Sequence, residues 1–318
     1  MKFGVYAEKW LAAKKGCVKD STYYLYHYSL GKYIDEHLGH VHLRMIDNRR
    51  LEKLARSWLT EQSSRTQGLS RGTVRNLLVL VGQILGEAMK ERKIKPFKIS
   101  VGVLPAVRKD RCKTISRECQ QQLVDGAVED GSAKAVGVVL AAATGMREGE
   151  VCGLQWKDVN LEEGVLKVCQ TVYRHYVEGG VHRTAVSVGE PKTSSSERIL
   201  PIPDGLLEIM RKMPRGSGDE FVISGRTKPV EPRELCRFHK KLCETLGVPA
   251  HRFHALRHTF ATECIAKGAD CKVVSETLGH SSVRMTLDLY THPDMEQKRK
   301  CVNSLGLFKK RGGNSALE

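Results

Sequence analysis

The sequence has no hydrophobic run long enough to cross a membrane. The apolar stretch from Val136 to Ala143 has eight residues, whereas a membrane-spanning helix needs roughly 18 or more. The first residues, Met1-Lys2-Phe3-Gly4, lack the apolar segment and the small-residue cleavage site of a secretory signal. We therefore expect a soluble, cytoplasmic protein.

The Cys-x-x-Cys motif is also missing. The sequence has ten cysteines, and their closest spacings are all of seven residues. These spacings exclude a zinc ribbon and a thioredoxin-like redox site. We expect reduced cysteines that pack as small hydrophobic side chains, and we predict neither a metal nor another cofactor. The closest pairs are Cys112 and Cys119, Cys236 and Cys243, and Cys264 and Cys271.

Acidic residues are scarce in the first third of the chain. The whole sequence has 52 Lys and Arg against 36 Asp and Glu, a net charge of +16. Residues 1–110 contain 21 basic and 10 acidic residues, and residues 111–318 contain 31 and 26. Such asymmetry is typical of a domain that binds a polyanion. A basic helix on a membrane surface is the alternative, but no long basic stretch has a continuous apolar face, so nucleic acid is favoured.

Apolar residues recur at helical spacing in four stretches of the first hundred residues, as in Val74, Leu77, Val81 and Leu85. Asp47 and Ser70 are placed to cap the third and fourth helices. The basic, proline-containing stretch that follows has the character of a linker. We predict a helical DNA-binding domain over residues 1–104, a linker over 105–113 and a second domain over 114–318.

The second domain has a mixed pattern. A short strand is expected at Val165 to Val168, a hairpin over Gln170 to Ser187 around Gly179-Gly180, and a last strand from Arg198 to Pro203. The fold class is therefore mainly α with a small antiparallel β-sheet. Helices are expected at Cys119–Val128, Ala133–Ala143, Glu148–Leu154, Glu234–Thr245, Ala255–Lys267, Cys271–Leu278 and Ser282–Leu289.

Two arginines, two histidines and a tyrosine stand in short motifs of this second domain. Arg147 lies in Thr-Gly-Met-Arg-Glu-Gly-Glu, His254 and Arg257 lie in His-Ala-Leu-Arg, and His280 follows Leu-Gly. Tyr290 comes ten residues later. Cationic side chains can neutralise phosphate oxygens while a phenol attacks, so this set is suited to breaking a phosphodiester without a metal.

These motifs, with Glu-Pro-Lys192-Thr-Ser and Asp-Leu-Tyr290-Thr-His, resemble the tyrosine recombinase (phage integrase) family. The resemblance spans Ala142 to His292, about half of the chain. It implies that the N-terminal helical bundle is a core-binding domain and that the second domain is catalytic. It also implies that the enzyme is a metal-independent DNA strand transferase and site-specific recombinase.

The resemblance assigns a role to each motif residue. Tyr290 would be the nucleophile and would form a covalent 3′-phosphotyrosine. Arg147 and Arg257 would bind the non-bridging oxygens and stabilise the transition state. His254 and His280 would donate hydrogen bonds and take part in proton transfer.

Lys192 would protonate the leaving 5′-oxygen from a β-hairpin turn between Gly189 and Ser196. Lys167 is the alternative general acid. Glu150, one helical turn after Arg147, is expected to orient local structure rather than to react. The basic residues expected to contact DNA phosphates are Lys14, Lys15, Lys19, Arg71, Arg75, Lys95 and Lys98.

The expected partners are double-stranded DNA, three further copies of the chain in a tetramer on two DNA sites, and accessory DNA-bending or directionality proteins. Met295 to Phe308 resembles the C-terminal element that docks on a neighbouring protomer. The expected setting is the nucleoid of a bacterial host, with integration and excision of a mobile element. The β-segment from Leu166 to Lys192 resembles that of conjugative-transposon integrases, here without an arm-binding domain or as a piece of a longer integrase.

Several alternatives remain open. A chromosome-dimer resolvase, an invertase or a type IB topoisomerase would use the same residues. A non-catalytic DNA-binding regulator would keep only the fold. A metal-dependent nuclease is a further rival. A zinc site at His254 and His258 is disfavoured because the glutamate of a metalloprotease helix is missing between those histidines and because phosphoryl transfer with two arginines needs no metal.

Overall fold

The structure is a computed structural model of the whole chain. It describes residues 1–60, 62–63, 66–100, 114–176, 184–190 and 196–290, together with Met295, Arg299, Val302 and Asn303. The chain divides into two compact units, one of Met1–Asp110 with Arg174–Ser187 and the other of Arg111–Tyr173 with Val188–Glu318. The predicted linker over 105–113 lies outside the described residues, so the domain boundaries stay a prediction.

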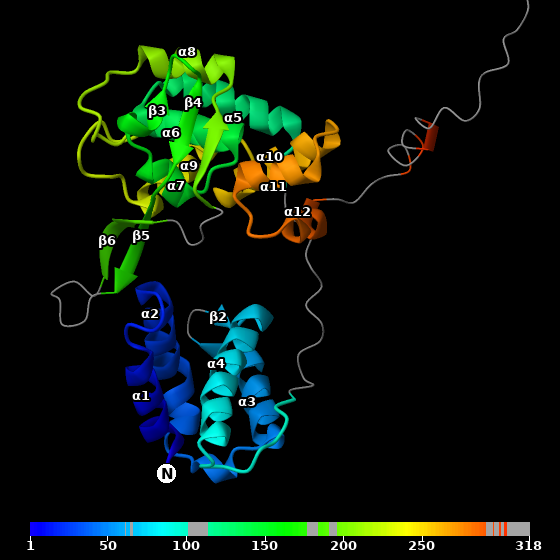
Figure 1. Cartoon of the computed structure of the whole chain (residues 1–318). Coiled ribbons are helices and arrows are strands. Elements are labelled where there is room, and N and C mark those ends of the chain that lie inside the picture. Colours follow the sequence, from blue (N-terminus) through cyan, green and yellow to red (C-terminus); the bar gives the residue numbers. More distant parts are fainter. Residues whose placement is uncertain are drawn as a thin grey trace, which may run out of the picture. The chain divides into compact units, whose positions relative to one another are not determined.

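The first unit contains the predicted helical bundle (Figure 1). Both predicted caps are confirmed, because Asp47 Oδ1 accepts a hydrogen bond from Arg50 N at 2.8 Å and Ser70 Oγ accepts one from Thr73 N at 3.1 Å. The second predicted helix changes from α to π hydrogen bonding at Leu30. A short antiparallel pair, β1 and β2, was not predicted, because two-residue strands leave no alternating pattern. The elements are α1 (Phe3–Lys14), α2 (Asp20–Ser29), η1 (Leu30–Gly39), η2 (Leu43–Met45), α3 (Asn48–Thr60), β1 (Gln62–Ser63), β2 (Thr66–Gln67) and α4 (Arg71–Lys90).

The second unit is built around α6 (Ala133–Thr144), which is buried on nearly all sides. It packs against α5 (Arg117–Asp130), α7 (Glu148–Gly153), α8 (Asp204–Lys212), α9 (Pro232–Thr245) and α10 (His254–Ala266). Two further helices, α11 (Cys271–Leu278) and α12 (Val283–Tyr290), pack against α10. The predicted helices are therefore confirmed, and their ends shift by one or two residues.

The described strands between Val159 and Pro201 form two separate sheets. β4 (Val165–Val168) lies between β3 (Val159–Asn160) and β7 (Arg198–Pro201) in an antiparallel sheet. Leu166 of β4 pairs with Leu200 of β7, and both side chains are buried. A second sheet contains β5 (Thr171–Tyr176) and β6 (Thr184–Gly189). The predicted hairpin is thus confirmed, although Gly179-Gly180 lies outside the described residues.

The predicted hairpin turn around Lys192 is wrong. β6 ends at Gly189 and pairs with β5, whereas β7 begins at Arg198 and pairs with β4. The segment between them therefore joins two sheets and not two strands of one hairpin. The physical reason is that β7 alternates exposed and buried residues, so its apolar side completes the core next to β4.

Among the described residues, no helix combines the length and the apolar character that crossing a bilayer requires.

Candidate active site

A glycine turn at the end of α6 sets the position of Arg147. Gly145 has φ +68°, and a Cβ there would lie 2.6 Å from Phe260 Cδ1 and 2.8 Å from Leu278 Cδ2. Only glycine fits this left-handed, crowded position. The chain reverses at the turn, and Arg147 precedes the first residue of α7. Arg147 therefore lies two residues after the glycine that ends α6.

Arg257 on α10 is the most deeply buried charged side chain among the described residues, with 2% of its surface exposed. Its Nη1 donates to Gly145 O at 2.9 Å and its Nη2 donates to Leu278 O at 2.7 Å. These carbonyls end α6 and α11, where carbonyl groups lack partners within the helix and the helix dipole is negative. The guanidinium therefore joins three helices and finds the hydrogen bonds that a buried charge needs.

Arg147 is less buried than Arg257, and 35% of its side chain is exposed. Its backbone N donates to Glu150 Oε2 at 3.0 Å, and its Nη1 donates to Glu150 Oε1 at 2.6 Å. Its Nη2 reaches Gly279 O at 3.4 Å. The glutamate thus fixes both the backbone and the side chain of Arg147, while part of the guanidinium stays open to a ligand.

Glu150 is itself held by an arginine that sequence reasoning missed. Arg198 Nη2 lies 2.9 Å from Glu150 Oε2, and the two side chains are 6% and 3% exposed. Arg198 also donates to Thr277 O at 2.6 Å and to Ser196 O at 2.9 Å. Burial alone would raise the pKa of Glu150, but the hydrogen bond and charge of Arg198, together with Arg147, hold that pKa below its usual range. The sequence signal that could have identified Arg198 is its position at the start of an otherwise apolar strand.

His280 connects this network to α12. Gly279, with φ +65°, ends α11, and the next residue points its Nδ1 at Thr286 Oγ1, 2.8 Å away. Thr286 is fully buried on α12, the helix that ends at Tyr290. Burial, and then the charges of Arg257 and Arg147, lower the pKa of His280 to about 4. The imidazole is therefore neutral at pH 7 when no anion is bound.

The two histidines of α10 stand one turn apart. Their ring centroids are 4.7 Å apart and the rings are nearly perpendicular. Burial lowers the pKa of His254, and the charges of Arg257 and Arg147 lower it further against the opposing charge of Glu148. Burial and then the charge of His254 lower the pKa of His258 to about 4. Neither histidine belongs to a group of three possible metal ligands among the described residues.

The structure thus brings together the regions of Arg147, Arg257 and His280, because both arginines bind carbonyls in the turn just before His280. Tyr290 is the last residue of α12, and its side chain lies outside the described part of the chain, as does all of Lys192. Lys167 is on β4, where it forms a 2.8 Å ion pair with Glu197 at the surface.

The predicted DNA-contact residues are all in the first unit. Lys14 lies over the Trp10 ring, 5.2 Å from its centroid. The other predicted contacts are exposed on the helices or on the segments next to them, and they are Lys15, Lys19, Arg71, Arg75, Lys95 and Lys98. Their contact with DNA stays a prediction.

The buried ion pair gives a first testable prediction. Replacing Arg198 with Ala leaves the Glu150 carboxylate buried with one fewer partner, so the free energy of unfolding should fall by about 3–5 kcal/mol. Lys167→Ala removes a solvent-exposed ion pair next to it and should cost no more than about 1 kcal/mol. Urea unfolding followed by circular dichroism measures the free energy of unfolding of both variants. Equal losses in the two variants would contradict the larger contribution proposed for the buried ion pair.

The lowered pKa of His280 predicts acid sensitivity. Its folded pKa of about 4 lies below the unfolded value of about 6.5, so the unfolded chain binds more protons between these values. Stability should therefore fall as pH falls from about 6.5 towards 4. In His280→Gln the loss of unfolding free energy between pH 7 and pH 5 should be smaller than in the wild type. A loss of the same size in both proteins would refute this assignment.

Comparison with known proteins places the chain in a family. Residues 107–297 match the phage integrase family, and residues 2–59 match the phage integrase N-terminal SAM-like domain. A tyrosine recombinase XerC-like protein of Caldanaerobacter subterraneus subsp. tengcongensis is 31% identical over 185 residues, which are 52% of this chain and 47% of that protein. The ICEBs1 integrase of Bacillus subtilis is 26% identical over 303 residues, covering 90% of this chain and 78% of that protein.

Solved structures share the fold. The Tn1549 transposon integrase in complex with a circular intermediate DNA superposes with a TM-score of 0.78 at 19% identity, covering 96% of this chain and 99% of that chain. A lambda integrase tetramer bound to a Holliday junction gives a TM-score of 0.68 at 16% identity, covering 93% of this chain and 80% of that chain. The chain spans about half the length of the XerC-type relatives that it matches. Since the match over residues 107–297 takes up more than half of the sequence, the chain belongs to the phage integrase family of tyrosine recombinases.

Proposed function

We propose that this protein is a site-specific DNA recombinase that cleaves and rejoins strands through a covalent 3′-phosphotyrosine on Tyr290. The observation that carries the proposal is the turn at Leu278 and Gly279. Its carbonyls hold the guanidinium groups of Arg257 and Arg147, and it leads directly into His280. Positive charge and neutral imidazoles therefore gather beside the helix that ends at Tyr290.

The charges fit a phosphate in the site. A phosphodiester that undergoes attack gains negative charge on its non-bridging oxygens, and fixed guanidinium groups stabilise that charge without reorganisation. Arg147 is the more accessible of the two arginines. His254 and His280 are neutral, so each can donate or accept a proton beside the reacting oxygen.

The reaction needs no nucleotide. The phenol oxygen of Tyr290 forms a bond to phosphorus, the bond to the 5′-oxygen breaks, and that oxygen takes a proton from a general acid. One phosphate ester replaces another, so the phosphotyrosine retains the energy that the 5′-hydroxyl uses when it re-forms the DNA. A free phenol has a pKa of about 10, so nearby positive charge is needed to favour the phenolate.

Duplex DNA is the proposed substrate. The first unit contains most of the net positive charge of the chain, which favours contacts with a phosphate backbone. The related Tn1549 and lambda integrases were solved with DNA, and the lambda complex is a tetramer on a Holliday junction. By analogy we propose a tetramer on two DNA sites, with the C-terminal segment over 295–308 docking on a neighbour. We also propose action with accessory proteins at the bacterial nucleoid.

Integration and excision of a mobile element is the proposed role. The match to the ICEBs1 integrase covers most of this chain, and the Tn1549 protein is a transposon integrase of the same fold. The ICEBs1 protein is named an integrase and the Tn1549 protein a transposon integrase, which favours this role over the resolution of chromosome dimers.

The nucleophile can be tested with a nicked suicide substrate, which traps the covalent complex. Wild type should form a protein–DNA adduct, and Tyr290→Phe should bind the same DNA but form none, because it lacks the attacking oxygen. Tyr173→Phe is the matched control on β5 and should form the adduct at the wild-type level.

Other outcomes would identify other functions. Wild type that binds DNA but gives no adduct would favour a regulator. Cleavage that a chelator abolishes and that Tyr290→Phe leaves intact would establish a metal-dependent nuclease. An adduct that Tyr290→Phe retains would place the nucleophile on another tyrosine.

The general acid can be tested separately. Lys192→Ala should slow cleavage about 10²–10⁴-fold, and a substrate with sulfur in place of the bridging 5′-oxygen should restore most of the rate. A thiolate leaves without a proton because the pKa of a thiol, about 8.5, is far below that of an alcohol. Lys167→Ala should cleave both substrates at the wild-type rate. Sulfur rescue of Lys167→Ala instead of Lys192→Ala would assign the role to Lys167.

A further inference from the structure

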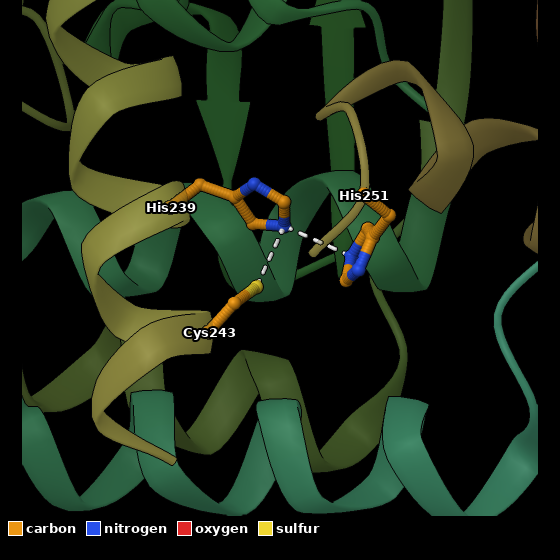
Figure 2. Close-up of side chains that lie close together, drawn as sticks. All are labelled: His239, Cys243 and His251. Carbon is orange, nitrogen blue, oxygen red and sulfur yellow. Dashed lines mark hydrogen bonds between the residues drawn. The ribbon is translucent and has the colours of Figure 1, made fainter. Parts of the chain in front are cut away.

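A second cluster of reactive side chains lies in the core of the catalytic unit. His239 and Cys243 stand one turn apart on α9, and His251 approaches them from the segment between α9 and α10 (Figure 2). His239 Nε2 is 3.1 Å from His251 Nε2 and 3.6 Å from Cys243 Sγ. All three ligand atoms lie within 4.8 Å of one another. None of these residues has a role in the proposed strand transfer.

Two of the three side chains are buried in apolar surroundings, and His251 is partly exposed. His239 and Cys243 are each 1% exposed, among Leu235, Leu242 and Val248. The His239 and Phe253 rings are nearly perpendicular, with their centroids 5.3 Å apart. Since polar groups in such a place need partners, a convergence of two imidazoles and a thiol on one point requires a physical reason.

The hydrogen bonds leave a lone pair directed into the cluster. Pro249 O is only an acceptor, so His251 Nδ1, 2.8 Å away, donates its proton to it. A ring that donates from Nδ1 can offer the lone pair of its Nε2, and this atom lies 3.1 Å from His239 Nε2. A backbone carbonyl that fixes the outer ring nitrogen is the usual second contact of a histidine that binds a metal.

The spacing also fits a metal. Tetrahedral zinc has Zn–N bonds of about 2.0–2.1 Å and Zn–S bonds of about 2.3 Å, which separate two nitrogens by about 3.3 Å and a nitrogen and a sulfur by about 3.6 Å. The observed separations are 3.1 and 3.6 Å.

We propose that His239, Cys243 and His251 bind one Zn²⁺ ion. Two imidazoles and a thiolate, without a carboxylate, suit zinc and exclude Mg²⁺ and Ca²⁺, which prefer oxygen ligands. Cys243 loses its thiol proton to solvent as the sulfur–zinc bond forms. The ion ties α9 to His251, which lies three residues before His254, and so it fixes the start of α10.

The test uses the full-length chain without a histidine tag. The wild type should contain one zinc per chain by mass spectrometry of the metal. After the zinc is removed, Co²⁺ should produce visible bands of tetrahedral cobalt and a near-ultraviolet thiolate-to-cobalt band, and Zn²⁺ should displace it. Cys243→Ser should lose the thiolate band, and its zinc affinity should fall by more than about 100-fold.

Cys236→Ser is the matched control, since Cys236 lies on the same helix two turns earlier and is partly buried. It should keep both the zinc and the thiolate band. If Cys243→Ser does not fold by circular dichroism, His251→Gln provides the second variant, because His251 lies in a loop and is only partly buried. It should keep the thiolate band at high cobalt and lose zinc affinity by a similar factor.

Wild type without zinc and without a thiolate–cobalt band would overturn the proposal. So would equal loss of the band in Cys236→Ser, or loss of zinc in His258→Gln with retention in His251→Gln. These measurements use no DNA, so their failure leaves the proposed strand transfer untouched, and failure of the Tyr290 experiment leaves the zinc site untouched.

Discussion

The buried guanidinium of Arg257 is the interaction on which the rest of the candidate site depends. It lies between the carbonyl ends of α6 and α11 and donates to both at short distance. A charge in that position is stable only while both helices end there, and both ends are made by glycines with positive φ. The hydrogen bonds of Arg257 to the carbonyl ends of α6 and α11 therefore also fix the geometry of the site.

The positions of the other groups follow from that arrangement. The turn that binds Arg257 also binds Arg147, and it orients His280 towards Thr286 of α12. The buried carboxylate of Glu150 partly neutralises the arginines, since it forms ion pairs with both Arg147 and Arg198. The site is thus a positively charged region in which Glu150 is the buried acid among the described residues, and a phosphate would find charge that is already in place.

The start of α10 lies between the candidate active site and the cluster of His239, Cys243 and His251. His254 opens the helix on the side of the arginines, and His251 lies three residues earlier beside His239 and Cys243 (Figure 2). A metal in the second cluster would fix the start of α10 through His251, and it would not contact a phosphate in the candidate active site. The cluster belongs to the core of the unit, so the proposed zinc contributes to folding and not to strand transfer.

The sequence by itself determined the helices and most of their ends, and its motifs gave the residues that we propose for the candidate site. Glycine before Arg147, the caps at Asp47 and Ser70, and the short motifs around Arg257 and His280 are local patterns, and local geometry follows from them directly. Only the tertiary structure decided which distant groups meet. Arg198 lies 48 residues from its partner Glu150, and His251 lies 12 residues from His239 across a helix end. The hairpin expected around Lys192 was wrong for the same reason, because an alternating pattern marks a strand and its buried face, whereas the neighbouring strand is chosen by the packing of the core.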